Sequence, residues 1–152
     1  MSGKLIDNNR KRRGRPKTIE YDTTLAIAVN AYWSKGIDGM SVNEVCRLAK
    51  VSKPSLYREF GNEDGLLNAV FKYYGVGFHE KVNSVLNKRN GLEKNLEDLI
   101  HFVSFSGDQS ISPKGCLAEK GYQSLERLGE KGKLGLEFCT HGTLEVLEEW
   151  VA

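Results

Sequence analysis

Apolar residues recur at the three- and four-residue spacing of α-helices along most of this chain, and the first such stretch covers residues 23–35. Asp22 is placed to cap the start of this helix, and Gly36 to end it in the left-handed backbone that glycine adopts at little cost. The expected inner face consists of four residues: Leu25, Ala28, Val29 and Tyr32. Tyr32 and Trp33 are expected to pack in the core rather than to form a stacking platform.

The segment 41–60 predicts two short helices joined by a tight turn. Ser41 can accept a hydrogen bond from the amide of Glu44, whose side chain can reach back to the Ser41 amide, which makes a capping box. An apolar stripe then follows at helical spacing: Val42, Val45, Cys46 and Ala49. This first helix is expected to stop at Lys50.

The second short helix is expected to begin after Ser52, with Pro54 in the first turn, where a missing N–H removes no helical hydrogen bond. Leu56 and Phe60 should face inward. The outer face would then carry cationic and hydroxyl side chains: Lys53, Ser55, Tyr57 and Arg58. A two-turn helix is marginal alone, so its neighbours must hold it. Such a face suits a recognition helix in a major groove, and a merely solvated polar face is the alternative.

The rest of the chain also predicts helices, so the expected fold is all-α. A long helix should run from Asn62, its cap, to about residue 87, with Gly75 and Gly77 marking a kink or close packing. Another should cover 91–105, where the apolar residues at helical spacing are Leu92, Leu96, Leu99, Ile100 and Val103. A further helix should open at Gly115-Cys116-Leu117. The stretch 133–152 is amphipathic.

Charge is divided unevenly between the two parts of the chain. The net charge is +2 over 152 residues, a length that suits one domain or two small ones. Residues 1–60 carry 12 Lys and Arg against 6 Asp and Glu, whereas residues 61–152 carry 10 against 14. The basic part is the part with the two short helices. This asymmetry is expected of a protein that meets nucleic-acid phosphates with one end.

Residues 1–19 form a polar, basic arm that cannot bury a core and is expected to be disordered in isolation. Within it, Arg13-Gly14-Arg15-Pro16 has the form of an AT-hook, in which an extended Arg-Gly-Arg lies in a narrow minor groove. The narrow groove of A·T-rich DNA concentrates negative potential and attracts Arg13 and Arg15. A solubilising tail is the alternative.

The chemistry of an enzyme or a metal site is not visible in this sequence. The three cysteines are odd in number and widely spaced, which favours free thiols in a reducing cytoplasm: Cys46, Cys116 and Cys139. No histidine or cysteine pair has metal-ligand spacing, and no nucleophile–base arrangement appears. We therefore expect no enzyme, no cofactor and no metal. No apolar run is long enough for a membrane span and no secretory signal is present, so we expect a cytoplasmic protein without a membrane partner.

Two segments of this sequence, GMSVNEV and VSKPSLYREFGNEDGLL, together resemble the helix-turn-helix of the TetR/AcrR family of bacterial transcriptional regulators. The matching positions are Gly36, Ser41, Val42, Cys46, Ala49, Val51, Ser52, Leu56, Tyr57 and Phe60. The match is strong over about residues 20–75. It implies a three-helix DNA-binding domain at 20–62 and a helical regulatory domain at 63–152.

The resemblance implies a sequence-specific DNA-binding transcriptional regulator, most often a repressor that a small apolar effector ligand releases from a double-stranded operator. It also implies a homodimer. The implied DNA-binding residues are Arg13, Arg15, Ser41, Val42, Lys50, Ser52, Lys53, Pro54, Ser55, Tyr57 and Arg58. Among these, Ser41, Lys50, Ser52 and Tyr57 are expected at phosphates. Lys53, Ser55 and Arg58 are expected nearest to base edges, and the two arm arginines in the minor groove.

The sequence departs from the family pattern at three positions. Met40 replaces a usual Thr, Lys50 an often-present Gly that suits a left-handed turn, and Glu63 a frequent Lys that touches phosphate. The chain is also expected to lack two helices that build the family's dimer interface, as a truncated product, a compact variant or a protein that dimerises differently. The alternative function is therefore a helical interaction protein, or a truncated regulator, that binds DNA weakly or pairs with a full-length partner.

Overall fold

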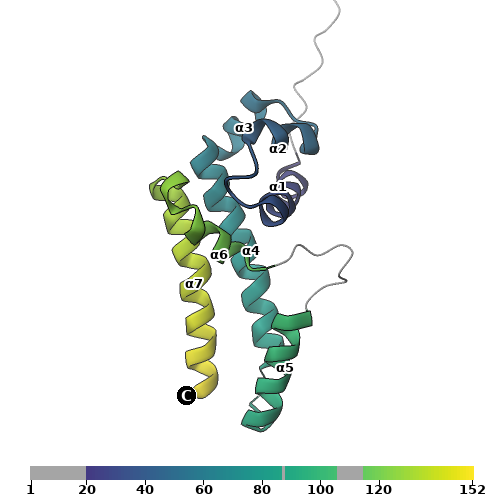
Figure 1. Ribbon diagram of the computed structural model, residues 1–152, viewed down its shortest axis with the longest axis vertical. Helices are drawn as coiled ribbons and strands as arrows, with labels where there is room; N and C mark the ends of the chain where they lie inside the picture. Colours follow the sequence, from purple (N-terminus) through teal and green to yellow (C-terminus); the bar gives the residue numbers. More distant parts are fainter. Residues whose placement is uncertain (1–19, 87, 106–114) are drawn as a thin grey trace, which may run out of the picture.

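A computed structural model describes residues 20–86, 88–105 and 115–152 of this chain, with side chains described up to residue 102 in the second range. Every regular element in these ranges is helical, which confirms the all-α prediction (Figure 1). The elements are α1 (Tyr21–Lys35), α2 (Val42–Ala49), α3 (Lys53–Phe60), α4 (Glu63–Val85), α5 (Leu92–Phe105), α6 (Leu117–Gln123), the 3-10 turn η1 (Leu125–Arg127) and α7 (Glu130–Val151).

The start of α1 differs from the prediction by two residues. Glu20, not Asp22, is the last extended residue before the helix, and Asp22 lies in the first turn. The reason is tertiary, because the Tyr21 ring stacks on Phe60 of α3 with 5.0 Å between ring centroids and thereby fixes this turn. The end of α1 is as predicted, with Gly36 at a φ of 78°.

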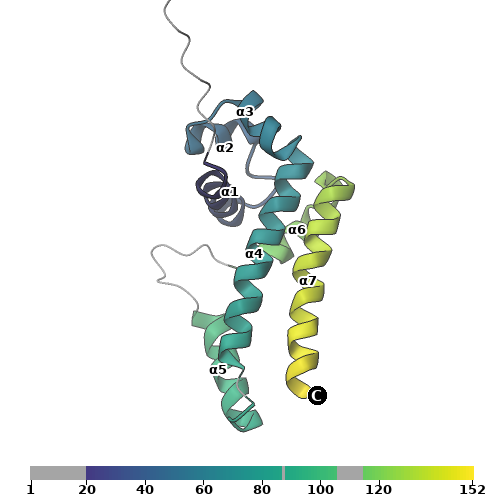
Figure 2. The same ribbon diagram turned by 180° about the vertical axis from the view of Figure 1, so that it is seen from behind.

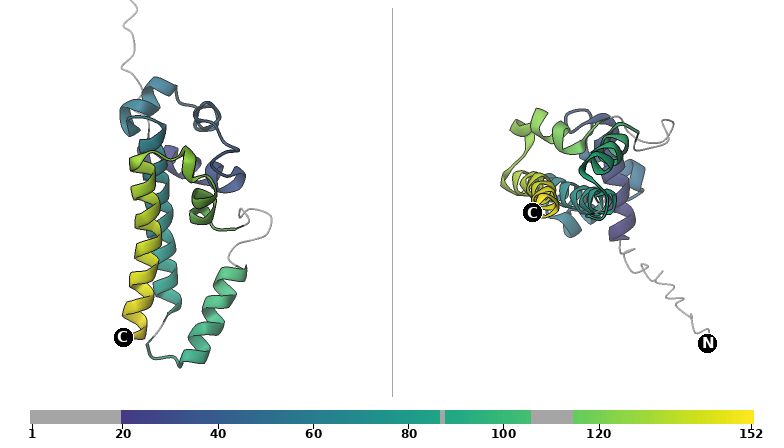
Figure 3. Two further views of the ribbon diagram at one scale, coloured as in Figure 1. Left: turned by 60° about the vertical axis from the view of Figure 1, so that its left-hand side comes forward. Right: turned by 90° about the horizontal axis from the view of Figure 1, so that it is seen from below.

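The long helix α4 is the axis of the molecule. Helices α1, α2 and α3 gather around its first turns, and α5 lies at its opposite end (Figure 1). Helix α7 runs beside α4 in the same direction over most of its length, as the views from behind and from the side also show (Figures 2 and 3). Helix α6 contacts α1, α4 and α7. The turn η1 that follows α6 contacts the loop after α1 through Arg127.

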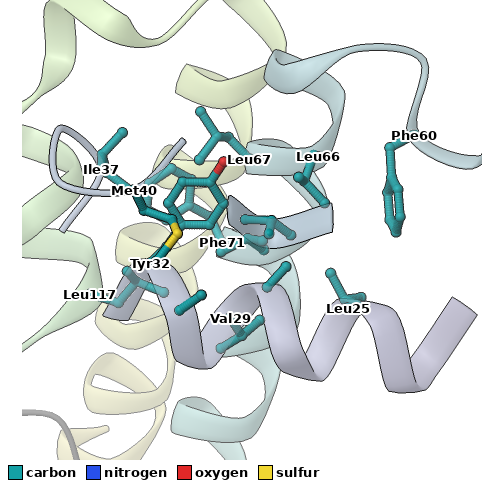
Figure 4. Packing of buried hydrophobic residues seen from close by; sticks show 14 of the residues in the cluster. Leu25, Val29, Tyr32, Ile37, Met40, Phe60, Leu66, Leu67, Phe71 and Leu117 are labelled. Carbon is teal, nitrogen blue, oxygen red and sulfur yellow. The ribbon is translucent and has the colours of Figure 1, made fainter. Parts of the chain in front are cut away.

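A single apolar core runs from α1 to α7. The predicted inner faces of α1 and α3 are buried in it. Figure 4 shows the Tyr32 ring among Met40, Leu67 and Phe71, with its hydroxyl turned toward Leu67. Met40, which stands where the family usually has Thr, is therefore a core residue and not a surface one.

Glycines allow α4 and α7 to pack closely against each other. A Cβ atom on Gly135 would lie 2.7 Å from the Asn68 backbone oxygen, and one on Gly75 would lie 3.1 Å from the Cys139 Cα. Gly77, in contrast, has no atom within 4 Å of an added Cβ. Helix α4 is continuous through both of its inner glycines, so close packing at Gly75, and not a kink, accounts for this pattern.

The apolar stripe predicted for α5 does not face the core. Leu92 and Ile100 are 63% and 64% exposed. The helix instead contacts α4 through Phe102, whose ring lies 5.8 Å from that of Phe78. Helical spacing indicates which residues lie on the same face of a helix, but it does not indicate which face packs against the core. On α7, likewise, Leu136 is buried while Leu144 of the same amphipathic stretch is exposed.

The three cysteines are free, as predicted. Burial raises the pKa of Cys139 to about 12, so this thiol stays protonated at neutral pH. Cys116 precedes α6 and is half-buried, with its sulfur 3.6 Å from the Tyr74 hydroxyl. None of the described helices combines the length and the apolar character that crossing a membrane requires.

Candidate nucleic-acid interface

The start of α2 is held by the predicted capping box. The Glu44 amide donates to the Ser41 hydroxyl oxygen at 3.3 Å, and the Ser41 amide donates to the Glu44 carboxylate at 3.2 Å. The Ser41 amide, and then Lys35 at 3.5 Å, hold the pKa of the Glu44 carboxyl below its ordinary value. The box fixes the direction in which α2 leaves the preceding loop.

The turn between α2 and α3 is a Schellman motif without glycine. Lys50 adopts left-handed backbone, with φ 55° and ψ 40°, as the usual glycine would. Its amide donates to the Arg47 carbonyl, and the next amide, of Val51, donates to the Cys46 carbonyl. The Lys50 side chain is exposed at this corner. The turn therefore has the backbone geometry that a glycine would give it and adds a cation to the surface.

Helix α3 is anchored from its inner side and capped at its start. Leu56 and Phe60 are buried, as predicted. The Ser52 hydroxyl accepts from the Ser55 amide at 3.2 Å, and Pro54 occupies the first turn. Because the apolar side is fully used for packing, the opposite side of this two-turn helix must face outward.

The outward side of α3 carries a short polar network. The Ser52 hydroxyl donates to the Ser55 hydroxyl, and a nitrogen of the Arg58 guanidinium donates to the same Ser55 oxygen, each at 2.8 Å. The Lys53 ammonium lies 5.5 Å from the centre of the Tyr57 ring. These contacts limit the rotamers of the two cations and leave most of their donors unused. The face thus presents cations and hydroxyls that also contact one another.

The remaining candidate residues fall into three situations. The Val42 side chain is 5% exposed, so only its backbone N–H, at the start of α2, could meet a phosphate. Pro54 is exposed and lacks an N–H to donate. Arg13 and Arg15 lie outside the described residues. Sequence reasoning passed over Arg47, an exposed cation in the last turn of α2, three residues before Lys50.

The residues at the start of α4 are engaged elsewhere in the protein. The Glu63 carboxylate accepts from Arg127 at 2.8 Å. Asp64 accepts from three backbone amides at the start of α7: Gly129, Lys131 and Gly132. The acidic replacement at residue 63 is thus neutralised by a cation 64 residues away. No local pattern could have revealed this pairing.

Aromatic residues noted in the sequence serve packing. Tyr32 is buried, and the Trp33 indole donates to the Gly115 carbonyl at 2.7 Å while its ring meets Tyr74 edge-on. Among the residues that the structure describes, no three or more His, Cys, Asp or Glu side chains gather so that they could hold a metal ion.

Comparison with known proteins matches residues 25–70 to the family described as bacterial regulatory proteins, tetR family. Two proteins of Escherichia coli (strain K12) are similar to this chain. The HTH-type transcriptional repressor ComR is 30% identical over 108 residues, which cover 70% of this chain and 51% of ComR. The HTH-type transcriptional repressor BdcR is 34% identical over 111 residues, which cover 73% of this chain and 56% of BdcR. The chain thus spans about half the length of these relatives.

Among solved structures, the reduced form of E. coli NemR is similar in fold, with a TM-score of 0.69. The match covers 85% of this chain and 68% of NemR, at 20% sequence identity. The matched residues 25–70 contain the capping box, the Schellman turn and the anchored α3. Residues 25–70 of this chain therefore belong to the tetR family of bacterial regulatory proteins.

Proposed function

We propose that this chain is a sequence-specific DNA-binding transcriptional regulator whose helix α3 enters the major groove. The observation that carries the proposal is the outer face of α3. Its cations and hydroxyls contact one another, while Leu56 and Phe60 hold the helix from behind. A cationic two-turn helix that is anchored in this way suits base-edge readout.

The proposed contacts divide by chemistry. Ser41, Ser52, Tyr57 and Lys50 would bind phosphates, together with the free amides at the starts of α2 and α3. Lys53, Ser55 and Arg58 would lie nearest to base edges, since Arg and Lys pair with guanine O6 and N7. Arg13 and Arg15 of the arm would enter an adjacent minor groove.

More specifically, the protein would act as a repressor by occupying an operator. The support for repression is that both curated relatives are named as repressors. Those names also favour a regulator over a helical interaction protein. Two subunits would be needed for specificity, because one short helix contacts few bases and a dimer reads two half-sites at fixed spacing. The protein would act in the bacterial cytoplasm.

Release by a small apolar ligand is supported by a row of half-buried aromatic rings. Trp33, Tyr74, Phe78 and Phe102 follow one another from α1 through α4 to α5, with 5.2, 6.0 and 5.8 Å between successive ring centroids. Half-buried aromatic rings suit contact with a flat apolar molecule. Such a ligand would release DNA only if it binds the non-operator conformation more tightly.

The test is fluorescence anisotropy of this protein on the DNA upstream of its own gene and on random duplex, over a salt series. A preference for the upstream duplex that survives rising salt is expected. Equal binding to both, with a steep salt dependence, would reduce the interaction to phosphate contacts and contradict sequence-specific recognition.

Two variants separate the proposed roles within α3. Arg58→Ala should relax preference at one base step, at a cost of about 1–3 kcal/mol on the upstream duplex only. The Tyr57 ring is half-buried against the apolar core. Tyr57→Phe keeps this ring and removes the hydroxyl, so it should weaken binding to both duplexes alike. Equal losses on both duplexes for Arg58→Ala would contradict a base-reading role for that residue.

A further inference from the structure

The 3-10 turn η1 and the serine before it join the end of α6 to the part of the chain that presents α2. The Arg127 guanidinium donates to the Ile37 carbonyl at 2.5 Å through one nitrogen and to the Glu63 carboxylate at 2.8 Å through another. The Ser124 hydroxyl donates to the Asp38 carboxylate at 2.6 Å. One side chain thus connects the α1–α2 loop, the start of α4 and η1.

The next residues extend this connection to α7. The Asp64 carboxylate accepts from the amides of Gly129, Lys131 and Gly132 at 2.8–2.9 Å, so it caps the start of α7 from another helix. Glu63 and Asp64 are neighbours at the first turn of α4. Glu63 contacts η1 and Asp64 contacts α7. Because the two residues are adjacent, a movement of this turn displaces both contacts.

The polar contacts to η1 fix the orientation of α1–α3 on α4, which the apolar core by itself does not. Hydrophobic burial is nearly non-directional, so the core around Leu66 and Phe71 permits small rotations of α1–α3 on α4. A guanidinium shared between a carbonyl and a carboxylate allows only a narrow range of geometries. The Arg127 and Glu63 side chains are 36% and 37% exposed, so their attraction is modest and their main contribution is geometric.

The loop that Arg127 contacts leads directly into the DNA-facing element. Ile37 is buried, and the chain passes from it through Met40 to Ser41, the cap of α2. A displacement of η1 would therefore change the direction of α2 and, through the Schellman turn, that of α3.

We propose that residues 124–127 form a latch that sets the orientation of α2 and α3 on the α4–α7 pair, with Arg127 as its positioning residue. Any event that displaces η1 from Ile37 and Glu63 loosens the proposed DNA-binding face. The affinity test of this inference rests on the proposed function, whereas the exchange test does not.

Hydrogen exchange tests the latch without DNA. Arg127→Ala should speed amide exchange in residues 37–60, while exchange along α4 and α7 beyond their first turns stays at the level of the unchanged protein. Arg127→Lys keeps the charge but replaces the two donor nitrogens of the guanidinium by one, so it should give an intermediate increase. Lys94→Ala is the matched control, because it removes the exposed Lys94–Asp98 ion pair at the far end of α4 and should leave residues 37–60 unaffected.

Uniformly faster exchange over the whole molecule would show that Arg127 contributes only to global stability, and it would overturn the proposal. Unchanged exchange in residues 37–60 would overturn it as well. If Arg127→Ala unfolds the protein, Ser124→Ala, which loses only the Asp38 contact, should show the same local pattern at smaller amplitude.

Anisotropy then tests the consequence for DNA. Arg127→Ala should weaken binding to the upstream duplex by about 3- to 30-fold, with a smaller change on random duplex, at a temperature where both proteins remain folded. Adding Glu63→Gln to Arg127→Ala should cause little further loss of affinity, because both substitutions break the same Arg127–Glu63 contact. Independent, additive losses would contradict the shared latch. If the unchanged protein shows no preference for the upstream duplex, the proposed function fails, and hydrogen exchange alone decides on the latch.

Discussion

Tyr32 shows what a single buried polar atom does in this protein. The side chain is fully buried, and its hydroxyl has no hydrogen-bond partner among the described residues (Figure 4). Burial, and next the nearby Glu63 carboxylate, raise the pKa of this hydroxyl above its ordinary value of 10.0. The ring contributes apolar packing while the hydroxyl contributes a desolvation cost.

Tyr32→Phe should therefore not lower the free energy of unfolding at neutral pH, and should raise it by up to about 1 kcal/mol. The unfolded chain loses the tyrosine proton above pH 10 while the folded chain keeps it. Stability of the unchanged protein thus falls as pH rises above 10, by up to about 1.4 kcal/mol per pH unit from this group. The advantage of Tyr32→Phe should grow over the same range in urea titrations. A loss above 1 kcal/mol at pH 7 would instead show that the hydroxyl binds an internal water.

At the scale of the element, Lys50 ends α2 in left-handed backbone, a conformation that is unfavourable for residues with a side chain. Lys50→Gly should raise the free energy of unfolding by about 0.5–1 kcal/mol, because it relieves left-handed strain of about 1–2 kcal/mol but adds unfolded-state entropy. Lys50→Ala keeps the strain and should give no gain in urea denaturation. Both variants should reduce the salt slope of DNA binding by about one if Lys50 binds a phosphate. An unchanged salt slope would show that Lys50 does not bind a phosphate.

The pairing of α4 with α7 gives a second prediction at this scale. Gly135→Ala would bring a Cβ within 2.7–2.8 Å of Asn68 backbone atoms and should lower the free energy of unfolding by about 1–3 kcal/mol. Gly77→Ala is the matched control, also within a helix but facing open space, and should raise stability by about 0.5–1 kcal/mol. Thermal unfolding of both variants checks this. Equal effects would mean that the helices are not in close contact at Gly135.

At the scale of the whole molecule, Asp64 links the first turn of α4 to the first turn of α7 across 65 residues of sequence. Asp64→Ala leaves three amides without this acceptor and should lower the free energy of unfolding by about 1–2 kcal/mol. Asp64→Asn keeps one acceptor oxygen and should lose less. Chemical denaturation measures both. If Asp64→Ala is neutral, solvent replaces the carboxylate, and the cap does not stabilise α7.

The sequence by itself determined the features that depend on residues within about five positions of one another. The Ser41–Glu44 capping box, the Ser52 cap, the left-handed Lys50 and the buried Leu56 and Phe60 were all predictable, because caps, turns and helix faces are local. The outward face of α3, on which the proposed function depends, follows from the same spacing. The roles of its residues at DNA remain predictions.

Only the tertiary structure decided which surfaces and charges meet. The α5 stripe looked like a core face but is exposed around Leu92 and Ile100, since periodicity does not specify a partner. Glu63 looked like a lost phosphate contact, yet it pairs with Arg127, and Gly75 proved to be a packing residue of α4. Contacts across more than 60 residues depend on how the helices are arranged in space, and a linear pattern of side chains carries no information about that arrangement.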